Sequence, residues 1–521
     1  MTEAPTGDEH ALSPDETPKI TGHSLGRIVS GLGWNTSGQV VMVLVNVGLT
    51  PFLLMRLGLD RYGLYALLSS FRGLLSNLDG GLGPTSVRYF SVYAGAGDRR
   101  ATSSLLLTIS GLLALVVGVV TALVAIFAPD LVVVLHTSAS LHRSAAMLLR
   151  YFMVLLFIAA LRGVLQRIIS AEHRWAYLNI SQTGAMVVYA GLAVLLVGQG
   201  HGLVGLLWAS VGQESVLVVL SVVGAYRHID FQQCRWMSWS EIRAILHYAA
   251  RVQVAAITSS FNFEIDALIV GFLFPIRDVG FYSIGANFSA QLVGLPMNAV
   301  APIAVTVSRT YGSYGLGGAI KEFTHLQRVW VRAIGCYSLV GAVSAYFAIS
   351  RWLGPREHLA AAVASILLVG QTTGLLSRVM DEFVKSINRP GIESRYLGVG
   401  TLVNVAFTIP LAFAIGMLGV PIGTALGATV SSLYFLRLAR REVSPVIQSF
   451  LAELPVLATG VAVAITGALE LLVYRWAPRG VVGLLLCGVP ALIALGVYAL
   501  ITAGGRPAIA RIRNRMANGL Q

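Results

Sequence analysis

The sequence predicts an all-α polytopic membrane protein with about fourteen transmembrane helices. Of its 521 residues, 55% are hydrophobic and only 12% are charged, whereas about 25% of a soluble domain is charged. The mean hydropathy is +0.74, and the apolar runs have the length of about 20 residues that a spanning helix needs, which the strands of a membrane barrel do not reach. A soluble domain, a disordered chain and a disulfide-rich secreted protein are therefore excluded.

Fourteen apolar segments can be placed along the chain, each near the length of a spanning helix. They fall at residues 32–55, 63–92, 103–127, 146–168, 176–198, 202–225, 245–274, 278–306, 329–350, 359–383, 395–417, 419–437, 450–474 and 481–503. The longest connection, 226–244, contains Trp236 and Trp239. Because tryptophan favours the membrane–water interface, we expect this segment to lead into the seventh span along that interface.

The basic residues predict the orientation. The net charge is +13, and basic residues gather on the cytoplasmic side of membrane proteins, so nucleic-acid binding is not needed to explain it. With the N-terminus inside, 23 Lys and Arg residues fall on the cytoplasmic side and 8 on the other. We therefore expect a plasma (inner) membrane protein with both termini in the cytoplasm, where 1–25 forms a disordered tail and 505–521 a basic tail.

An internal repeat predicts two lobes. The segment 61–67 (Arg-Tyr-Gly-Leu-Tyr-Ala-Leu) opens the second span, and 278–284 (Asp-Val-Gly-Phe-Tyr-Ser-Ile) opens the eighth, 217 residues later. Gly205 and Gly423 match at a shift of 218. Since each repeat holds six spans, the lobes are parallel, and transporters built this way bind substrate between their repeats. The predicted units are an N-lobe (26–226), a C-lobe (227–442) and a C-terminal helix pair (443–504).

Two short segments resemble a known family. Residues 57–65 read Leu-Gly-Leu-Asp-Arg-Tyr-Gly-Leu-Tyr, residues 78–83 read Leu-Asp-Gly-Gly-Leu-Gly, and 87–89 read Val-Arg-Tyr. They resemble the polysaccharide-transporter branch of the multidrug/oligosaccharidyl-lipid/polysaccharide (MOP) flippase superfamily, over residues 26–503. The resemblance implies translocation of undecaprenyl-linked oligosaccharides from the cytoplasmic to the periplasmic leaflet, with glycan polymerase or export machinery as a further partner. The lipid II flippases of this superfamily also have fourteen helices, whereas its drug exporters more often have twelve.

Polar side chains inside the spans are the candidate substrate-cavity residues, because such residues face a cavity or a partner. At 100° per residue, those within one span share a helix face. The candidates are Gln39 and Asn46 in span one, Arg72 and Asp79 in span two, and Asn287 and Gln291 in span eight. The resemblance implies that spans one, two, seven and eight face the central cavity.

Each candidate residue also has a possible structural role. The guanidinium of Arg72 suits a pyrophosphate or an acidic sugar, since it can bind phosphate with two hydrogen bonds; the alternative is an ion pair with Glu214. Asp79 relays protons or binds a coupling cation, and its structural alternative is an ion pair with Arg88. The amides of spans one and eight either bind sugars or hydrogen-bond between helices.

The candidates for ion coupling are Asp266, Glu264 and Glu214. Asp266 is predicted to relay protons or bind a coupling cation, and its structural alternative is an ion pair with Arg251. Near the cytoplasmic end of span ten, Arg378, Glu382 and Lys385 align on one helix face and are gate candidates; the alternative is an interface cluster whose side chains reach toward water.

Several functions are disfavoured by what the sequence lacks. It contains no GxxxxGK[ST] phosphate-binding loop, so no ATPase is expected in the chain. Its three cysteines and ten histidines show no metal-ligand spacing, and no metal or other cofactor is expected. A glycan polymerase or ligase would carry a large extracytoplasmic loop. The predicted function is a lipid-linked oligosaccharide flippase and not an enzyme; a cation-coupled multidrug exporter and a lipid II flippase are the alternatives.

Overall fold

The structure is a computed structural model that describes residues 22–502, apart from 77–78, 80, 96, 135–140, 173, 231, 233, 299, 355–356, 388–390 and 444–453. Every regular element in this part of the chain is a helix, which confirms the predicted all-α class. The α-helices are α1 (Gly22–Leu57), α2 (Leu59–Ser76), α3 (Leu82–Gly95), α4 (Arg99–Ile126), α5 (Ala128–Val134), α6 (His142–Ala171), α7 (Trp175–Gly198), α8 (Gly202–Ala225), α9 (Trp239–Leu273), α10 (Ile276–Met297), α11 (Val300–Leu353), α12 (His358–Ser386), α13 (Gly391–Ile415), α14 (Gly419–Glu442), α15 (Val456–Trp476) and α16 (Val481–Thr502).

The chain is a multi-pass membrane protein. Within the described residues, ten stretches of helix are long and apolar enough to cross a membrane, and one of them, Arg395–Glu442, takes in both α13 and α14. The helices α2, α9 and α10 are not among these stretches, and they carry several of the polar candidates. Because polar residues lower the hydropathy of a helix that faces a cavity, a count based on hydropathy stays below fourteen. The count of fourteen therefore remains a prediction.

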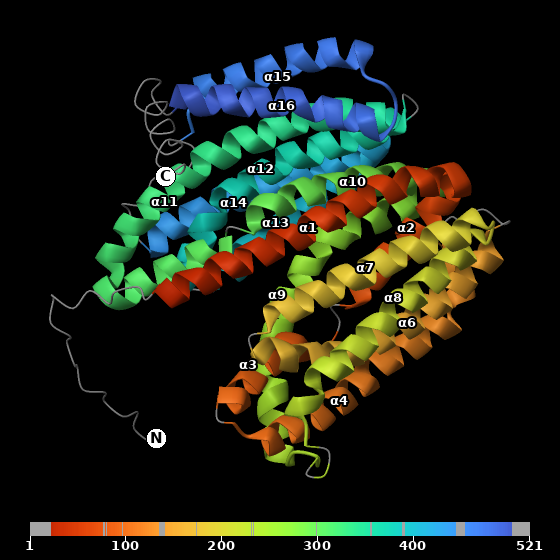
Figure 1. Ribbon diagram of the computed structural model, residues 1–521, viewed down its shortest axis with the longest axis vertical. Helices are drawn as coiled ribbons and strands as arrows, with labels where there is room; N and C mark the ends of the chain where they lie inside the picture. Colours follow the sequence, from red (N-terminus) through yellow and green to blue (C-terminus); the bar gives the residue numbers. More distant parts are fainter. Residues whose placement is uncertain are drawn as a thin grey trace, which may run out of the picture.

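The helices form two bundles (Figure 1). We call α3, α4, α6, α7 and α8 the N-terminal bundle and α10 to α14 the C-terminal bundle; α15 and α16 pack against α11 on the outside of the latter. Helix α1 packs mainly against α7, and α2 packs against α10 and α9. The bundles meet at the right of Figure 1 and diverge toward the left. The exact lobe boundaries given above remain predictions.

The predicted second span is broken into α2 and α3 around an Asp-Gly-Gly sequence. The carboxylate of Asp79 accepts hydrogen bonds from the backbone N–H groups of Gly81 and Gly83, at 2.9 and 2.8 Å. These bonds satisfy N–H groups that have no partner within the new helix. Gly81 has a φ of 73°, and a Cβ there would lie 2.1 Å from the backbone oxygen of Ala249 in α9. Glycine is therefore required at the break, both for its conformation and for the close approach of α9.

Two connections between the predicted spans contain helix. The connection predicted between residues 306 and 329 is helical, because α11 runs from Val300 to Leu353 with a single interruption at Gly315, where φ is 63°. The connection after the third span contains the short helix α5. In both places the residues are too polar or too few for a membrane span, but nothing in them prevents a helix. Hydropathy therefore located the spans better than it located the ends of the helices.

The segment before α9 lies against the first half of α4. The aromatic ring of Trp236 occupies the space over Gly111, where a Cβ would come within 2.3 Å of it. Ser238 and Glu241 form a reciprocal N-terminal capping box that begins α9, and these hydrogen bonds hold the pKa of the Glu241 carboxyl below its usual value. Trp236 and Trp239 are 55% and 72% exposed, as expected for side chains at a membrane interface.

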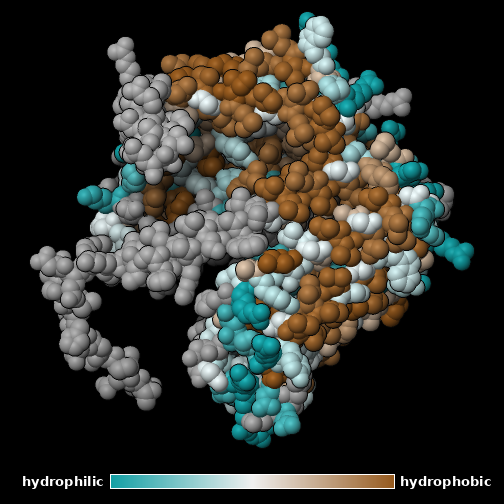
Figure 2. Space-filling model, in the orientation of Figure 1, coloured by the Kyte–Doolittle hydropathy of each residue, from teal (hydrophilic) through white to brown (hydrophobic). Residues whose placement is uncertain are grey.

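Apolar side chains cover much of the surface. In Figure 2 they form broad patches over both bundles, and polar residues gather at the lower end of the N-terminal bundle. On α15, Leu457 and Trp476 are 84% and 87% exposed. Large apolar side chains exposed in this number fit a surface that faces lipid rather than water.

The two copies of the sequence repeat contact each other. Gly63 at the start of α2 and Gly280 at the start of α10 are the equivalent glycines of the two copies, 217 residues apart. A Cβ on Gly63 would lie 2.2 Å from the backbone oxygen of Ile276, and one on Gly280 would lie 2.8 Å from the side chain of Leu59. The backbones of the two repeats thus meet directly, and neither glycine leaves room for a side chain.

We expect Gly63→Leu to lower the thermal midpoint of the purified protein, because a side chain at this position collides with the backbone at Ile276. Overpacking of this kind costs about 1–3 kcal/mol. The measurement is heat-induced unfolding in detergent. Gly48→Leu is the matched control, since nothing lies within 4 Å of the Cβ position at Gly48. Equal midpoints for the two variants would contradict the close contact of α2 and α10.

Candidate functional site

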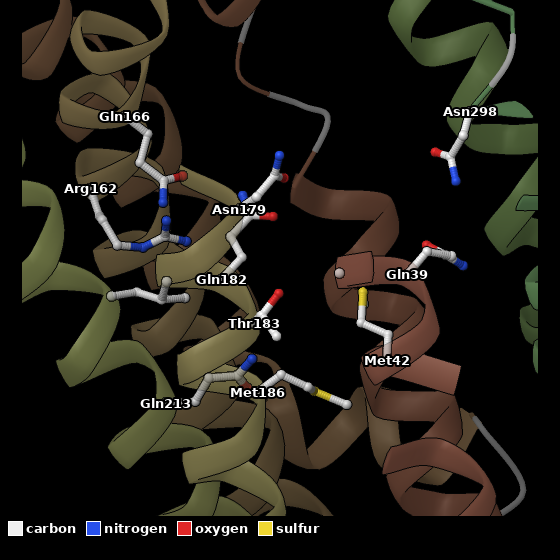
Figure 3. A pocket seen from close by; sticks show the side chains of 12 residues that line it. Gln39, Met42, Arg162, Gln166, Asn179, Gln182, Thr183, Met186, Gln213 and Asn298 are labelled. Carbon is white, nitrogen blue, oxygen red and sulfur yellow. The ribbon is translucent and has the colours of Figure 1, made fainter. Parts of the chain in front are cut away.

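A polar cavity of about 390 Å³ lies between α1, α6, α7 and α8. The end of α10 faces it from the other bundle, where Asn298 lies across a gap from Gln39 (Figure 3). The lining residues are Gly38, Gln39, Met42, Arg162, Gln166, Asn179, Gln182, Thr183, Met186, Gln213, Leu217 and Asn298. They contain no aromatic and no acidic side chain. The cavity is thus lined mainly by neutral hydrogen-bonding groups.

Two buried donors at this cavity lack a partner within the described part of the chain. They are the Nε2 atom of Gln166 and the Nδ2 atom of Asn298. Buried polar groups in folded proteins are almost always hydrogen-bonded, and leaving one unpaired costs about 1–3 kcal/mol. Both residues line the cavity. Their unpaired donors mark it as a place where water or a polar ligand binds.

The one charged residue that lines the cavity is balanced by a neighbour. The Nε atom of Arg162 in α6 lies 2.5 Å from the carboxylate of Glu214 in α8. The two side chains are only 13% and 14% exposed, so water screens their attraction weakly. Glu214 therefore holds Arg162 in place and cancels its charge.

Arg72 lies apart from this cavity. Its guanidinium carbon is 5.7 Å from the centre of the Phe152 ring, which is a cation–π contact between α2 and α6. Next to it, the hydroxyl groups of Tyr65 and Tyr189 are hydrogen-bonded at 2.7 Å. No carboxylate among the described residues forms an ion pair with Arg72, so the predicted alternative, a pair with Glu214, is not observed. Arg72 stays a candidate for binding an anion.

Asp79 has a structural role and a partner that the sequence did not indicate. Besides capping α3, its Oδ2 atom lies 3.4 Å from the guanidinium of Arg167 in α6. Arg88, the partner considered above, has its side chain outside the described residues. Asp79 thus ties the broken second span to α6.

The four amide candidates have different surroundings. Gln39 lines the cavity, whereas Asn46 does not. The Oε1 atom of Gln291 is buried without a partner among the described residues. Asn287 is exposed and contacts the hydroxyl of Tyr62 by a hydrogen bond. Only one of the four therefore belongs to the cavity, and the substrate role of the other three remains a prediction.

Asp266 in α9 lies buried against the C-terminal bundle. It is 2% exposed, and its Oδ2 atom accepts hydrogen bonds from the hydroxyls of Tyr282 in α10, at 3.0 Å, and Thr424 in α14, at 2.5 Å. Its Oδ1 atom has no partner in the described part of the chain. The side chains of Glu264 and Arg251 lie outside the described residues. The side chain of Asn404 in α13 also interacts with this carboxyl by a hydrogen bond. Asp266 is therefore a buried acid held by neutral groups from three helices.

The three gate candidates belong to an ion cluster between α12 and α13. Lys385 lies 2.9 Å from Asp381, 3.2 Å from Glu382 and 2.9 Å from Glu393. Arg378 lies 3.2 Å from Asp381. Asp381 is the centre of this cluster and is only 2% exposed, yet the sequence reasoning did not select it. The cluster connects two helices of the same bundle.

The sequence reasoning also missed most of the cavity. Its main lining residues come from α6 and α7, namely Arg162, Gln166, Asn179, Gln182 and Thr183. The sequence contains a signal for them, because polar residues spaced by three or four positions share one helix face. The family resemblance implied a cavity between spans one, two, seven and eight, whereas these residues lie in spans four and five.

The comparison with protein families identifies the chain. A model of the family described as polysaccharide biosynthesis protein matches residues 28–308, which is more than half of the sequence. The chain belongs to this family. No curated protein matches it closely enough to count as a relative.

Solved structures show that this family member has the fold of MOP superfamily transporters, as predicted. A lipid II flippase, MurJ, in an inward closed conformation has a TM-score of 0.69 at 12% identity, covering 91% of this chain and 98% of the flippase. An inward-facing multidrug resistance transporter of the MATE family has a TM-score of 0.64 at 15% identity, covering 80% and 95%. A MATE transporter of Vibrio cholerae gives 0.58 at 13% identity, covering 81% and 99%.

We expect a double-mutant cycle to show that Arg162 and Glu214 stabilise the fold as a coupled pair. Removing one partner of a buried pair leaves the other charge uncompensated and costs about 3–5 kcal/mol. Arg162→Met or Glu214→Leu alone should therefore destabilise the protein more than the two changes together. Thermal unfolding of the purified variants measures this. Destabilisations that simply add would show that the two residues are not coupled.

Proposed function

We propose that this polysaccharide biosynthesis protein is a flippase for undecaprenyl-pyrophosphate-linked oligosaccharide units. It moves them from the cytoplasmic to the periplasmic leaflet of the plasma membrane, where they are assembled into surface polysaccharide. The family match and the transporter fold support this proposal. The observation that carries it is the amide-lined cavity within a protein whose outer surface is apolar.

The cavity gives a polar head group a path through the membrane. A hydroxyl or amide that enters hydrocarbon without a hydrogen-bond partner costs about 2–7 kcal/mol, and an oligosaccharide carries many such groups. The cavity supplies amide donors and acceptors instead, while the polyprenyl tail stays in the lipid. Arg72 lies outside the lining of this cavity and has no carboxylate partner among the described residues, and it is the proposed binding group for the pyrophosphate.

The contact of α2 with α10 serves as the gate on the periplasmic side. The predicted orientation puts the start of both helices there, and the two glycines Gly63 and Gly280 bring their backbones together. Parallel repeats transport by rocking against each other around a central site. Separation of this contact opens the cavity outward, and its closure returns the protein to the cytoplasm-facing state.

Asp266 is the proposed coupling residue. It is a buried acid with an unpartnered oxygen, and it joins α9, α10 and α14. Binding of a proton or a sodium ion to that oxygen changes the charge at this junction, which biases the packing of the three helices. Glu214 and Glu264 are weaker candidates, since Glu214 is already paired with Arg162. The cluster of Arg378, Glu382 and Lys385 is the proposed cytoplasmic gate.

Drug export is the second candidate function, because multidrug resistance transporters of the MATE family share this fold. A cavity for cationic amphipathic drugs is expected to offer acidic and aromatic side chains. The lining described above contains neither. The observed lining therefore favours a glycan over a drug.

Deletion of the gene tests the proposed function. We expect loss of surface polysaccharide and accumulation of undecaprenyl-linked glycan in the cytoplasmic leaflet, because the polymerising machinery receives no substrate. The leaflet is determined by the access of a membrane-impermeant label. Unchanged polysaccharide with altered drug resistance would favour the exporter, and unpolymerised units in the outer leaflet would favour an enzyme.

Arg72→Ala should abolish transport without loss of protein from the membrane, because the anionic head group loses its cation. Arg72→Lys is the control, since it keeps the charge and should keep part of the activity. Both are measured by complementation of the deletion strain together with immunoblotting of membranes. Wild-type transport by a well-expressed Arg72→Ala protein would remove this residue from the site.

Asp266→Asn should leave the protein folded, because its amide oxygen still accepts from Tyr282 and Thr424. It should also remove the response of transport to an imposed proton or sodium gradient. Translocation in proteoliposomes with and without each gradient measures this. An unchanged response in the variant would assign the coupling to another residue.

A further inference from the structure

We infer that the cavity between α1, α6, α7 and α8 binds an uncharged sugar residue of the head group and discriminates against acidic sugars. This inference rests on the proposed function and narrows its substrate class. It depends on three features of the cavity, which are the type of its polar groups, its unpaired donors and its balance of charge.

The polar groups of the cavity match the hydroxyls of a sugar. Gln39, Gln182 and Gln213 each offer an amide oxygen that accepts and an amide nitrogen that donates. A sugar hydroxyl both donates and accepts, so it can satisfy either end of an amide. An ionised phosphate or carboxylate only accepts, and it would leave the amide oxygens desolvated and unpaired. The amide lining therefore suits a neutral, hydroxyl-rich group.

The unpaired donors show where such a group would be held. The Nε2 atom of Gln166 and the Nδ2 atom of Asn298 are buried and lack acceptors within the described residues. They reach the cavity from opposite bundles (Figure 3). A ligand with several hydroxyl or acetamido oxygens, one accepting from each donor, would connect the bundles. Apolar contacts come from Met42, Met186 and Leu217, which suit the C–H face of a sugar ring.

The charge balance excludes acidic sugars. Arg162 is the one charged residue in the lining, and the carboxylate of Glu214 lies against its Nε atom. A uronic acid placed beside Arg162 would bring a second carboxylate close to Glu214. Like charges in a weakly screened site repel each other, and a repulsive element of this kind is a common source of specificity. Glu214 is thus the specificity-determining residue.

The size of the cavity limits what it holds. Its volume of about 390 Å³ is near the lower end of the range of about 300–1,000 Å³ for small-molecule sites. It therefore accepts part of the head group rather than a whole oligosaccharide. The pyrophosphate lies outside this cavity.

The test uses two synthetic short-chain polyprenyl diphosphates, one that carries a neutral N-acetylglucosamine disaccharide and one that carries its glucuronic acid counterpart. Binding to the full-length protein in lipid nanodiscs is measured by calorimetry. We expect the neutral compound to bind about tenfold more tightly or better, and Gln182→Ala to weaken its binding by about tenfold, the effect of one lost hydrogen bond. Glu214→Gln frees the charge of Arg162 and should tighten binding of the acidic compound.

Two further variants serve as a control and as a replacement. Gln199→Ala, at the exposed end of α7, is the matched control and should bind like the wild type. Thr183→Val removes a lining hydroxyl at nearly constant volume and replaces Gln182→Ala if that protein does not fold. Equal affinity of the wild type for the two compounds would overturn the inference. So would Gln182→Ala and Thr183→Val proteins that bind the neutral compound as tightly as the wild type does.

The same compounds separate this inference from the proposed function. Reconstituted vesicles report translocation independently of binding. Translocation of both compounds at equal rates would overturn the neutral-sugar selectivity and leave the flippase function intact. Selective binding of the neutral compound without any translocation would support the selectivity and contradict the flippase function.

Discussion

The direct contact of the α2 and α10 backbones is the constraint on which the rest of the structure depends. Gly63 and Gly280, equivalent positions of an internal repeat, have no space for a side chain at this contact. The contact holds one end of the two bundles together, and from there they diverge (Figure 1). A repeat that meets its own copy in this way gives a pseudo-symmetric junction. The polar cavity lies between α1, α6, α7 and α8, and the end of α10 faces it from the other bundle.

Ion pairs hold several charged side chains within the helices in fixed positions. Arg162 and Arg167, both in α6, are paired with Glu214 and Asp79, so the N-terminal bundle holds these two cations in fixed positions. Glu214 makes the cavity electrically neutral, and Asp79 holds the broken second span against α6. Charges removed from water are costly unless they are paired. Arg72 and Asp266 have no ion pair among the described residues, and they are the two site candidates at which we expect a ligand or an ion.

The sequence predicted the class of fold, the repeat and the family, because these follow from hydropathy and from short motifs that survive in a single sequence. It did not predict the cavity. The lining residues Gln166 and Gln182 look like ordinary polar residues in spans four and five, and only the packing of α6, α7 and α8 brings them together. The pairing of Glu214 with Arg162 rather than Arg72 was equally hidden, since helix rotation and tilt decide it. Polar helices such as the start of α11 were missed because hydropathy marks spans and not helix ends.

Double electron–electron resonance across the α2–α10 contact tests the central claim most directly. Spin labels at Arg61→Cys and Arg277→Cys, both exposed, would be placed on a chain whose three native cysteines are replaced. The account predicts one short distance in the resting protein and a second, longer distance when undecaprenyl-linked glycan is added. A single distance that does not change with substrate, in a protein that still translocates glycan, would contradict the gate and with it the proposed rocking of the two bundles.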